Sequence, residues 1–190
     1  NLHIAFDQLE IFNRKKSGKI ESKIYSINQI KNLDKKIALI IKEDINKIIV
    51  KRKNILNIKF NKPQVMGVLN ITPDSFSDGG LFLDKAKAFK QANLMFKSGA
   101  KIIDIGGEST RPGSKPVKEK EEWIRIKKIL SRLKKKNPGM VLSLDTRKSY
   151  VMQKGIEHGV NIINDVSGLN FDKKSFSIIR SNRIPLVLNH

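Results

Sequence analysis

Residues 65–80 read VMGVLNITPDSFSDGG, and this stretch joins two different kinds of sequence. Its first half, residues 65–71, is short and nearly continuously apolar, as expected for a strand that is buried on both faces. Its second half carries Pro, Asp and Gly, which are typical of a connection between elements. Residues 83–98 follow with apolar positions at helical spacing and end before Gly99. We therefore predict a strand, a long loop and a helix, in this order.

The same alternation continues to the end of the chain. Strict alternation of strands and helices predicts a parallel sheet with right-handed crossovers, as either a barrel or an open doubly wound sheet. Counting the first pair, residues 63–190 hold five predicted strands and four predicted helices. The further strands are predicted at 101–105, 140–144, 161–166 and 185–189, and the further helices at 118–136, 148–157 and 172–181.

Residues 1–62 have a different composition, rich in Lys, Ile and Asn, with a single glycine. The pattern predicts a strand at 23–30 and a helix at 34–50. No chemical motif occurs there. We therefore place a domain boundary before Pro63 and treat residues 1–62 as an N-terminal α/β extension of unknown role.

The composition excludes several classes of protein. The 190 residues contain no cysteine, which excludes disulfides, thiolate zinc sites and thiol nucleophiles. No apolar run approaches the roughly 18 residues that a membrane span needs, and the N-terminus lacks the layout of a signal peptide. We expect a cytoplasmic protein without membrane contact.

The net charge of +20 favours an anionic partner, and a basic nucleic-acid-binding protein is one interpretation. However, the lysines are spread over the whole chain and no aromatic residues interleave with them as a stacking platform requires. The dense clusters at 51–53 and 134–136 are more typical of solvated ends of secondary structure. We therefore expect no nucleic-acid partner.

Polar residues occur where the predicted strands end. Asn70, Asp104, Asp145 and Asn164 each lie at or next to the end of a strand. Because parallel strands end on the same side, these groups should meet on one rim, where ligands bind in barrels and open α/β sheets. The long loops at 72–80 and 106–114 belong to the same rim and could close over a ligand.

Each of these residues also has a purely structural interpretation. Asp74 and Asp78 could form turns, and Asp145 could cap the following helix. Asp104 is different, because a carboxylate inside an apolar strand must be paired or hydrogen-bonded. The three histidines are too scattered for a metal cluster.

Four motifs together resemble those of one enzyme family. Residues 66–80 and residues 104–113, which read DIGGESTRPG, resemble the two signatures of dihydropteroate synthase. Residues 143–146 (SLDT) and 162–165 (IIND) resemble its third and fourth strand ends. The resemblance covers residues 64–190, and matches of this length, in order and on one rim, are far more specific than an isolated glycine motif.

The resemblance implies a (β/α)₈ TIM barrel, of which this chain holds the first five strands and four helices. It implies a step of folate synthesis, in which 4-aminobenzoate is joined to (7,8-dihydropterin-6-yl)methyl diphosphate and pyrophosphate is released. Mg²⁺, a homodimer at full length and sensitivity to sulfonamides are implied as well. Pterin-binding methyltransferases that serve corrinoid proteins are an alternative, which the two long loops argue against.

The resemblance also implies roles for individual residues. Asn70 would give its amide oxygen to Mg²⁺, which favours oxygen ligands. Asp145 and Asn164 would hold the pterin, because a carboxylate accepts two parallel bonds from an amino-pyrimidine edge and an amide both donates and accepts. Asp104 would lie near the pterin and organise its surroundings.

The two loops would form the second substrate pocket. Arg111 and Asp78 are the catalytic candidates, as a pair that joins the loops over the reacting pterin cation. The walls of the 4-aminobenzoate pocket would be Phe76, Thr110, Arg111 and Pro112.

The family's sixth, seventh and eighth strands carry an acidic residue, a Ser-Arg-Lys segment and an Arg-x-His segment, which are absent from this sequence. An unclosed barrel exposes strand edges. We therefore expect the 190-residue chain to be an N-terminal portion that is inactive and poorly soluble on its own.

Overall fold

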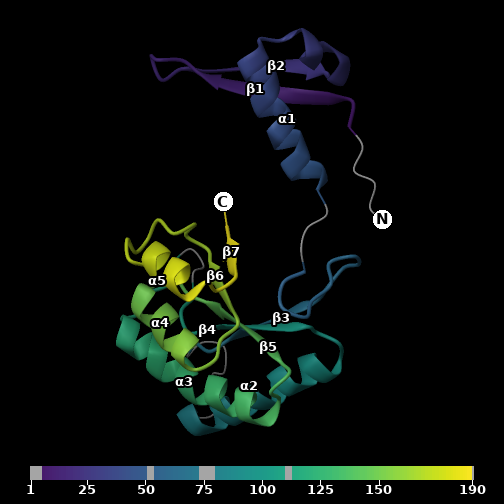
Figure 1. Ribbon diagram of the computed structural model, residues 1–190. Coiled ribbons are helices and arrows are strands. Elements are labelled where there is room, and N and C mark those ends of the chain that lie inside the picture. Colours follow the sequence, from purple (N-terminus) through teal and green to yellow (C-terminus); the bar gives the residue numbers. More distant parts are fainter. Residues whose placement is uncertain (1–5, 51–53, 73–79, 110–112, 190) are drawn as a thin grey trace. The chain divides into compact units, whose positions relative to one another are not determined.

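The computed structural model describes residues 6–50, 54–72, 80–109 and 113–189 (Figure 1). Its contacts divide the chain into two compact units, Asn1–Lys62 and Pro63–His190. Each unit is described by itself below. None of the helices in these ranges combines the length and the apolar character that crossing a membrane requires.

The first unit is a small α/β assembly. Strands β1 (Gln8–Arg14) and β2 (Ile20–Ser26) form an antiparallel hairpin, followed by the short 3₁₀ helix η1 (Ile27–Asn32) and helix α1 (Lys35–Ile49). The predicted helix at 34–50 is confirmed, and Asp34 caps it by accepting a hydrogen bond from the Lys36 amide.

The prediction for the preceding segment was partly wrong. Strand β1 was missed, and residues 27–30 continue as a 3₁₀ turn instead of a strand. Both strands are largely exposed, and burial alternates only over the first residues of β1, at Leu9 and Ile11, so neither strand carries a sustained alternation of apolar and polar residues.

The second unit confirms the predicted alternation. Its five strands form one parallel sheet in the order β3-β4-β5-β6-β7, and the described residues do not close it into a barrel (Figure 1). The ends of the elements differ from prediction by at most three residues. The elements are β3 (Met66–Asn70), α2 (Gly80–Lys97), β4 (Ile102–Gly106), α3 (Glu119–Lys136), β5 (Val141–Asp145), α4 (Ser149–Glu157), β6 (Ile162–Asp165), α5 (Ser175–Asn182) and β7 (Leu186–Leu188).

Helices cover one face of this sheet and form the core with it. Ile103, Leu142 and Ile163 of the strands and Leu130 and Met152 of the helices are fully buried in this core. Successive residues of a strand point to opposite faces, so Val68 and Asp104, which are paired in the register, lie on the other face. Val68 is 54% exposed, which shows that this second face is largely open near β3.

Candidate functional site

The carboxyl ends of four strands place their polar residues in one row. In the register of the sheet, Asn70 pairs with Gly106, Gly106 with Asp145, and Asp145 with Asn164. The expected convergence on one rim is therefore confirmed. Asp104 lies two residues before Gly106 on the same face, one layer deeper in the sheet.

Gly106 leaves space in the centre of this row. A Cβ atom on Gly106 would lie 3.3 Å from Asn70 Oδ1 and 3.5 Å from Asp145 Oδ2. The side chains of Asn70 and Asp145 therefore reach over Gly106 from the two neighbouring strands. Glycine at this position leaves room for both side-chain oxygen atoms beside the intervening strand.

Asp104 is buried, with 2% of its surface exposed, and it is hydrogen-bonded as the sequence required. Asn164 Nδ2 donates to Asp104 Oδ2 over 2.9 Å, while Asn189 Nδ2 lies 3.5 Å from Asn164 Oδ1. Asp104 Oδ1 has no hydrogen-bond partner among the described residues. A buried acceptor without a donor costs free energy, so this oxygen favours a ligand that brings N–H groups.

Burial, together with the negative charges of Asp104, Glu122, Asp165 and Glu108, raises the pKa of Asp145 to about 7. The alternative that Asp145 caps helix α4 is not supported, because the Ser149 amide donates instead to Asp172 Oδ2 over 2.9 Å. Asp145 is thus a carboxylate held in an unfavourable environment. Such perturbed groups are concentrated at functional sites.

Residues 66–190 match the pterin binding enzyme family. The chain belongs to this family. Among its relatives, dihydropteroate synthase from Bacillus subtilis is 43% identical over 147 residues, which are 77% of this chain and 51% of that protein.

Solved structures of dihydropteroate synthases are also similar to this chain. Dihydropteroate synthase from Clostridium difficile, in the presence of pteroic acid, has a TM-score of 0.65 and 41% identity over 67% of this chain and 48% of that chain. The Xanthomonas albilineans enzyme with 4-aminobenzoic acid has a TM-score of 0.66 and 38% identity over 70% of this chain and 49% of that chain. The chain therefore spans about half the length of the relatives it matches.

The row of polar residues lies at the carboxyl ends of parallel strands, the edge at which barrels and open α/β sheets bind their ligands. Four of the predicted site residues, Asn70, Asp104, Asp145 and Asn164, are brought together there. The other predicted site residues lie outside the described residues, as does the candidate turn residue Asp74: they are Phe76, Asp78, Thr110, Arg111 and Pro112. Where the chain is described, no group of three or more His, Cys, Asp or Glu could hold a metal ion.

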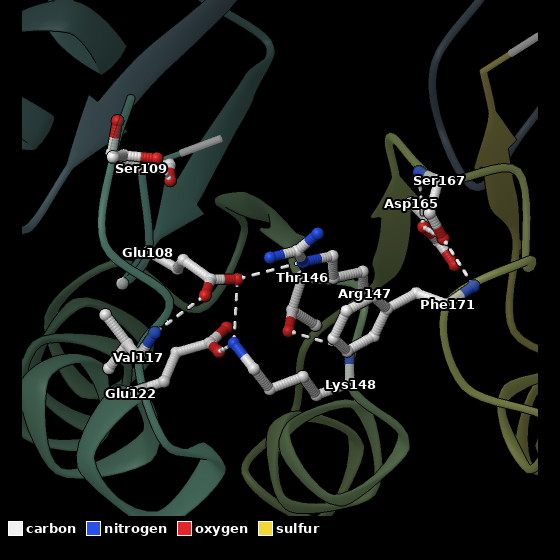
Figure 2. Close-up of polar contacts among 12 residues, drawn as sticks. Glu108, Ser109, Val117, Glu122, Thr146, Arg147, Lys148, Asp165, Ser167 and Phe171 are labelled. Carbon is white, nitrogen blue, oxygen red and sulfur yellow. Dashed lines mark hydrogen bonds and ion pairs between the residues drawn. The ribbon is translucent and has the colours of Figure 1, made fainter. Parts of the chain in front are cut away.

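Sequence reasoning missed a buried ionic cluster beside the rim (Figure 2). Lys148 Nζ lies 2.7 Å from Glu108 Oε2 and 2.5 Å from Glu122 Oε2. Glu122 is fully buried and occupies the apolar stripe of helix α3 with Trp123 and Ile126. A glutamate in such a stripe needs a cationic partner, and this was the signal in the sequence that could have revealed the cluster.

Proposed function

We propose that the protein acts as a dihydropteroate synthase, joining 4-aminobenzoate to (7,8-dihydropterin-6-yl)methyl diphosphate with release of pyrophosphate. The main support for this proposal is the row of Asn70, Asp145 and Asn164, which lies one layer above the buried Asp104. This row occurs in a chain of the pterin-binding family. Relatives named as synthases favour this reaction over the methyltransferase and nucleic-acid-binding alternatives.

Asp145 and Asn164 would hold the pterin. In its ionised form Asp145 can accept two parallel hydrogen bonds from the amino group and the ring N–H of a pterin. Asn164 is held by Asp104, so its orientation is set before the ligand arrives. Asp104 Oδ1 supplies a further buried acceptor.

In the reaction, the aminobenzoate nitrogen forms a bond to the pterin methylene carbon while the carbon–oxygen bond to the diphosphate breaks. Positive charge develops on the pterin as the diphosphate leaves. The carboxylates of Asp104 and Asp145 would stabilise this charge electrostatically. Arg111 and Asp78 would pair to order the two loops over the cation, and Phe76, Thr110 and Pro112 would exclude water around the second substrate.

Asn70 Oδ1 would bind Mg²⁺, and its surroundings fit a hard cation. Asn70 Oδ1 and Asp145 Oδ2 both lie close to the space above Gly106, and oxygen atoms are the ligands that Mg²⁺ prefers. When bound there, the ion would neutralise the diphosphate. As part of this proposal, the enzyme is a cytoplasmic homodimer at full length, and residues 1–62 are an extension without an assigned role.

Dihydropteroate formation tests the proposal directly. In the natural protein that contains this sequence, we expect Mg²⁺-dependent product formation that stops when EDTA is added and resumes with excess Mg²⁺. The isolated 190-residue chain should form no product. Product formation measured by chromatography checks both expectations. A natural protein that binds neither a pterin nor 4-aminobenzoate by calorimetry would contradict the assignment.

Gly106→Ala tests the space in the centre of the row. The added methyl group would fill the space between Asn70 and Asp145, and Asn70 Oδ1, 3.3 Å from the new Cβ, would have to shift by a few tenths of an ångström. We expect roughly tenfold weaker pterin binding, equivalent to about 1.4 kcal/mol, with little change in melting temperature. Calorimetry with a pterin analogue measures the affinity. Gly139→Ala is the matched control, since its Cβ would meet no atom within 4 Å; equal affinities of both variants would refute the role of Gly106.

A further inference from the structure

Arg147 follows strand β5 by two residues and contacts two neighbouring loops (Figure 2). Its Nε atom lies 3.1 Å from Glu108 Oε2, in the loop after β4. Its guanidinium group also stacks over the ring of Phe171, in the loop after β6, with 4.0 Å between Cζ and the ring centroid. One side chain thus joins the loops that follow three adjacent strands.

Glu108, the first contact of Arg147, holds the two ends of the second long loop together. Glu108 Oε1 accepts a hydrogen bond from the Val117 amide over 2.9 Å, so the carboxylate holds the end of residues 109–117 against their start. Gly107 O accepts a further bond from Arg125 Nη1 of α3. A shift of the Glu108 carboxylate would therefore change the position of Val117 relative to Glu108 and Gly107.

Phe171, the second contact of Arg147, is connected by hydrogen bonds to the end of β6. The Phe171 amide donates to Ser167 Oγ over 3.3 Å, and Ser167 Oγ donates to Asp165 Oδ1 over 2.7 Å. Asp165 directly follows Asn164, a proposed pterin ligand. A continuous series of contacts therefore leads from the pterin end of the sheet, through Arg147, to the second loop.

Arg147 is not needed to neutralise Glu108, because Lys148 Nζ already lies 2.7 Å from the same carboxylate. The Arg147 side chain is 25% exposed, whereas that of Lys148 is 10% exposed. Glu108 therefore keeps a cation when Arg147 is replaced. Arg147 instead fixes the positions of its two partners. Its planar guanidinium group can donate a directed hydrogen bond and stack on a ring at the same time, which a lysine ammonium group cannot do.

We propose that Arg147 is a positioning residue that sets the second loop relative to the pterin-binding strand ends and thereby determines the affinity for the aminobenzoate substrate. This proposal rests on the proposed function. Arg147 acts through Glu108 on one side and Phe171 on the other.

The kinetic test uses Arg147→Ser in the natural protein that contains this sequence. We expect the KM for 4-aminobenzoate to rise about tenfold, while the KM for the pterin diphosphate stays within twofold and the melting temperature within about 2 °C of the unaltered protein. Phe171→Ala should have a similar effect, and combining both changes should add little. Arg147→Lys should restore only part of the affinity, since it keeps the charge and loses the stacking plane.

Lys173→Ala is the matched control, because Lys173 is an exposed cation in the same loop as Phe171. It should leave both KM values unchanged. Equal increases of both KM values in Arg147→Ser, or no increase of either, would overturn the proposal, and so would full rescue by Arg147→Lys.

Hydrogen exchange at the Val117 amide separates this proposal from the proposed function. The amide should exchange at least about fivefold faster in Arg147→Ser than in Lys173→Ala, since its acceptor Glu108 would be less well held. Faster exchange in a protein that forms no dihydropteroate would refute the synthase assignment and leave the loop coupling supported. Unchanged exchange would overturn the role of Arg147 whatever the activity.

Discussion

Replacing Asp145 with Asn is expected to weaken pterin binding roughly 100-fold and to stabilise the folded protein at pH 8. The carboxylate is the proposed acceptor of two pterin donors, and an amide of the same shape offers one acceptor and an opposing donor. Loss of such a charge-assisted pair corresponds to about 3 kcal/mol, or roughly 100-fold in affinity. Calorimetry with a pterin analogue measures this loss. Asp44→Asn, at an exposed position on α1, is the control.

The stability effect follows from the direction of the pKa shift. Because the pKa of Asp145 is raised to about 7 from its ordinary 3.8, the folded protein holds a proton that the unfolded chain releases between about pH 4 and pH 7. Asp145 therefore destabilises the fold progressively as pH rises through this window, and fully above pH 7. The melting temperature of Asp145→Asn minus that of the unaltered protein should be near zero at pH 4 and reach several degrees at pH 8.

Pterin binding to the unaltered protein should also strengthen as pH rises towards and through 7, because ionised Asp145 is the form that accepts both donors. A difference in melting temperature that stays constant from pH 4 to pH 8 would contradict the raised pKa. Unchanged pterin affinity in Asp145→Asn would refute the binding role.

Lys148→Met should produce the largest loss of stability. The change leaves Glu122 fully buried without its cation and removes one of the cations that surround Glu108. Breaking a buried ion pair on one side costs on the order of 3–5 kcal/mol. Burial acts to raise the pKa of Glu108, but hydrogen bonds from Lys148, Val117 and Arg147 outweigh it and keep the pKa below its ordinary value. Urea denaturation measures the free energy of unfolding.

A second variant distinguishes charge from shape in this cluster. Adding Glu122→Leu to Lys148→Met should recover much of the lost stability, since Glu122 occupies the apolar stripe of α3. Lys154→Met is the matched control, because Lys154 Nζ lies 2.8 Å from Glu157 Oε2 in an ion pair on the surface; its effect should be small. If Lys148→Met and Lys154→Met lowered stability equally, the buried cluster would have no special importance.

The sequence determined the order of the elements and the position of the rim. Strands of the second unit are nearly continuous apolar runs, and their helices carry clear apolar stripes, so periodicity located all of them. It also determined that Asp104 must be hydrogen-bonded, because the carboxylate interrupts the apolar run Ile102–Gly106. In the first unit, strand β1 was missed and β2 was predicted only in part, since both strands are largely exposed and carry little of the alternation that marks a half-buried strand.

Only the tertiary structure decided which distant side chains meet. The sheet register aligns Asn70, Asp145 and Asn164, and the packing of α3 against the loop after β5 brings Glu122 to Lys148, 26 residues further along the chain. Arg147 offers no local signal, because its partners Glu108 and Phe171 come from different loops. The spacing of apolar residues reflects which positions of a helix or strand are buried, so it can be recognised in the local sequence. Contacts between loops depend on how strands pair, and they exist only once the sheet has formed.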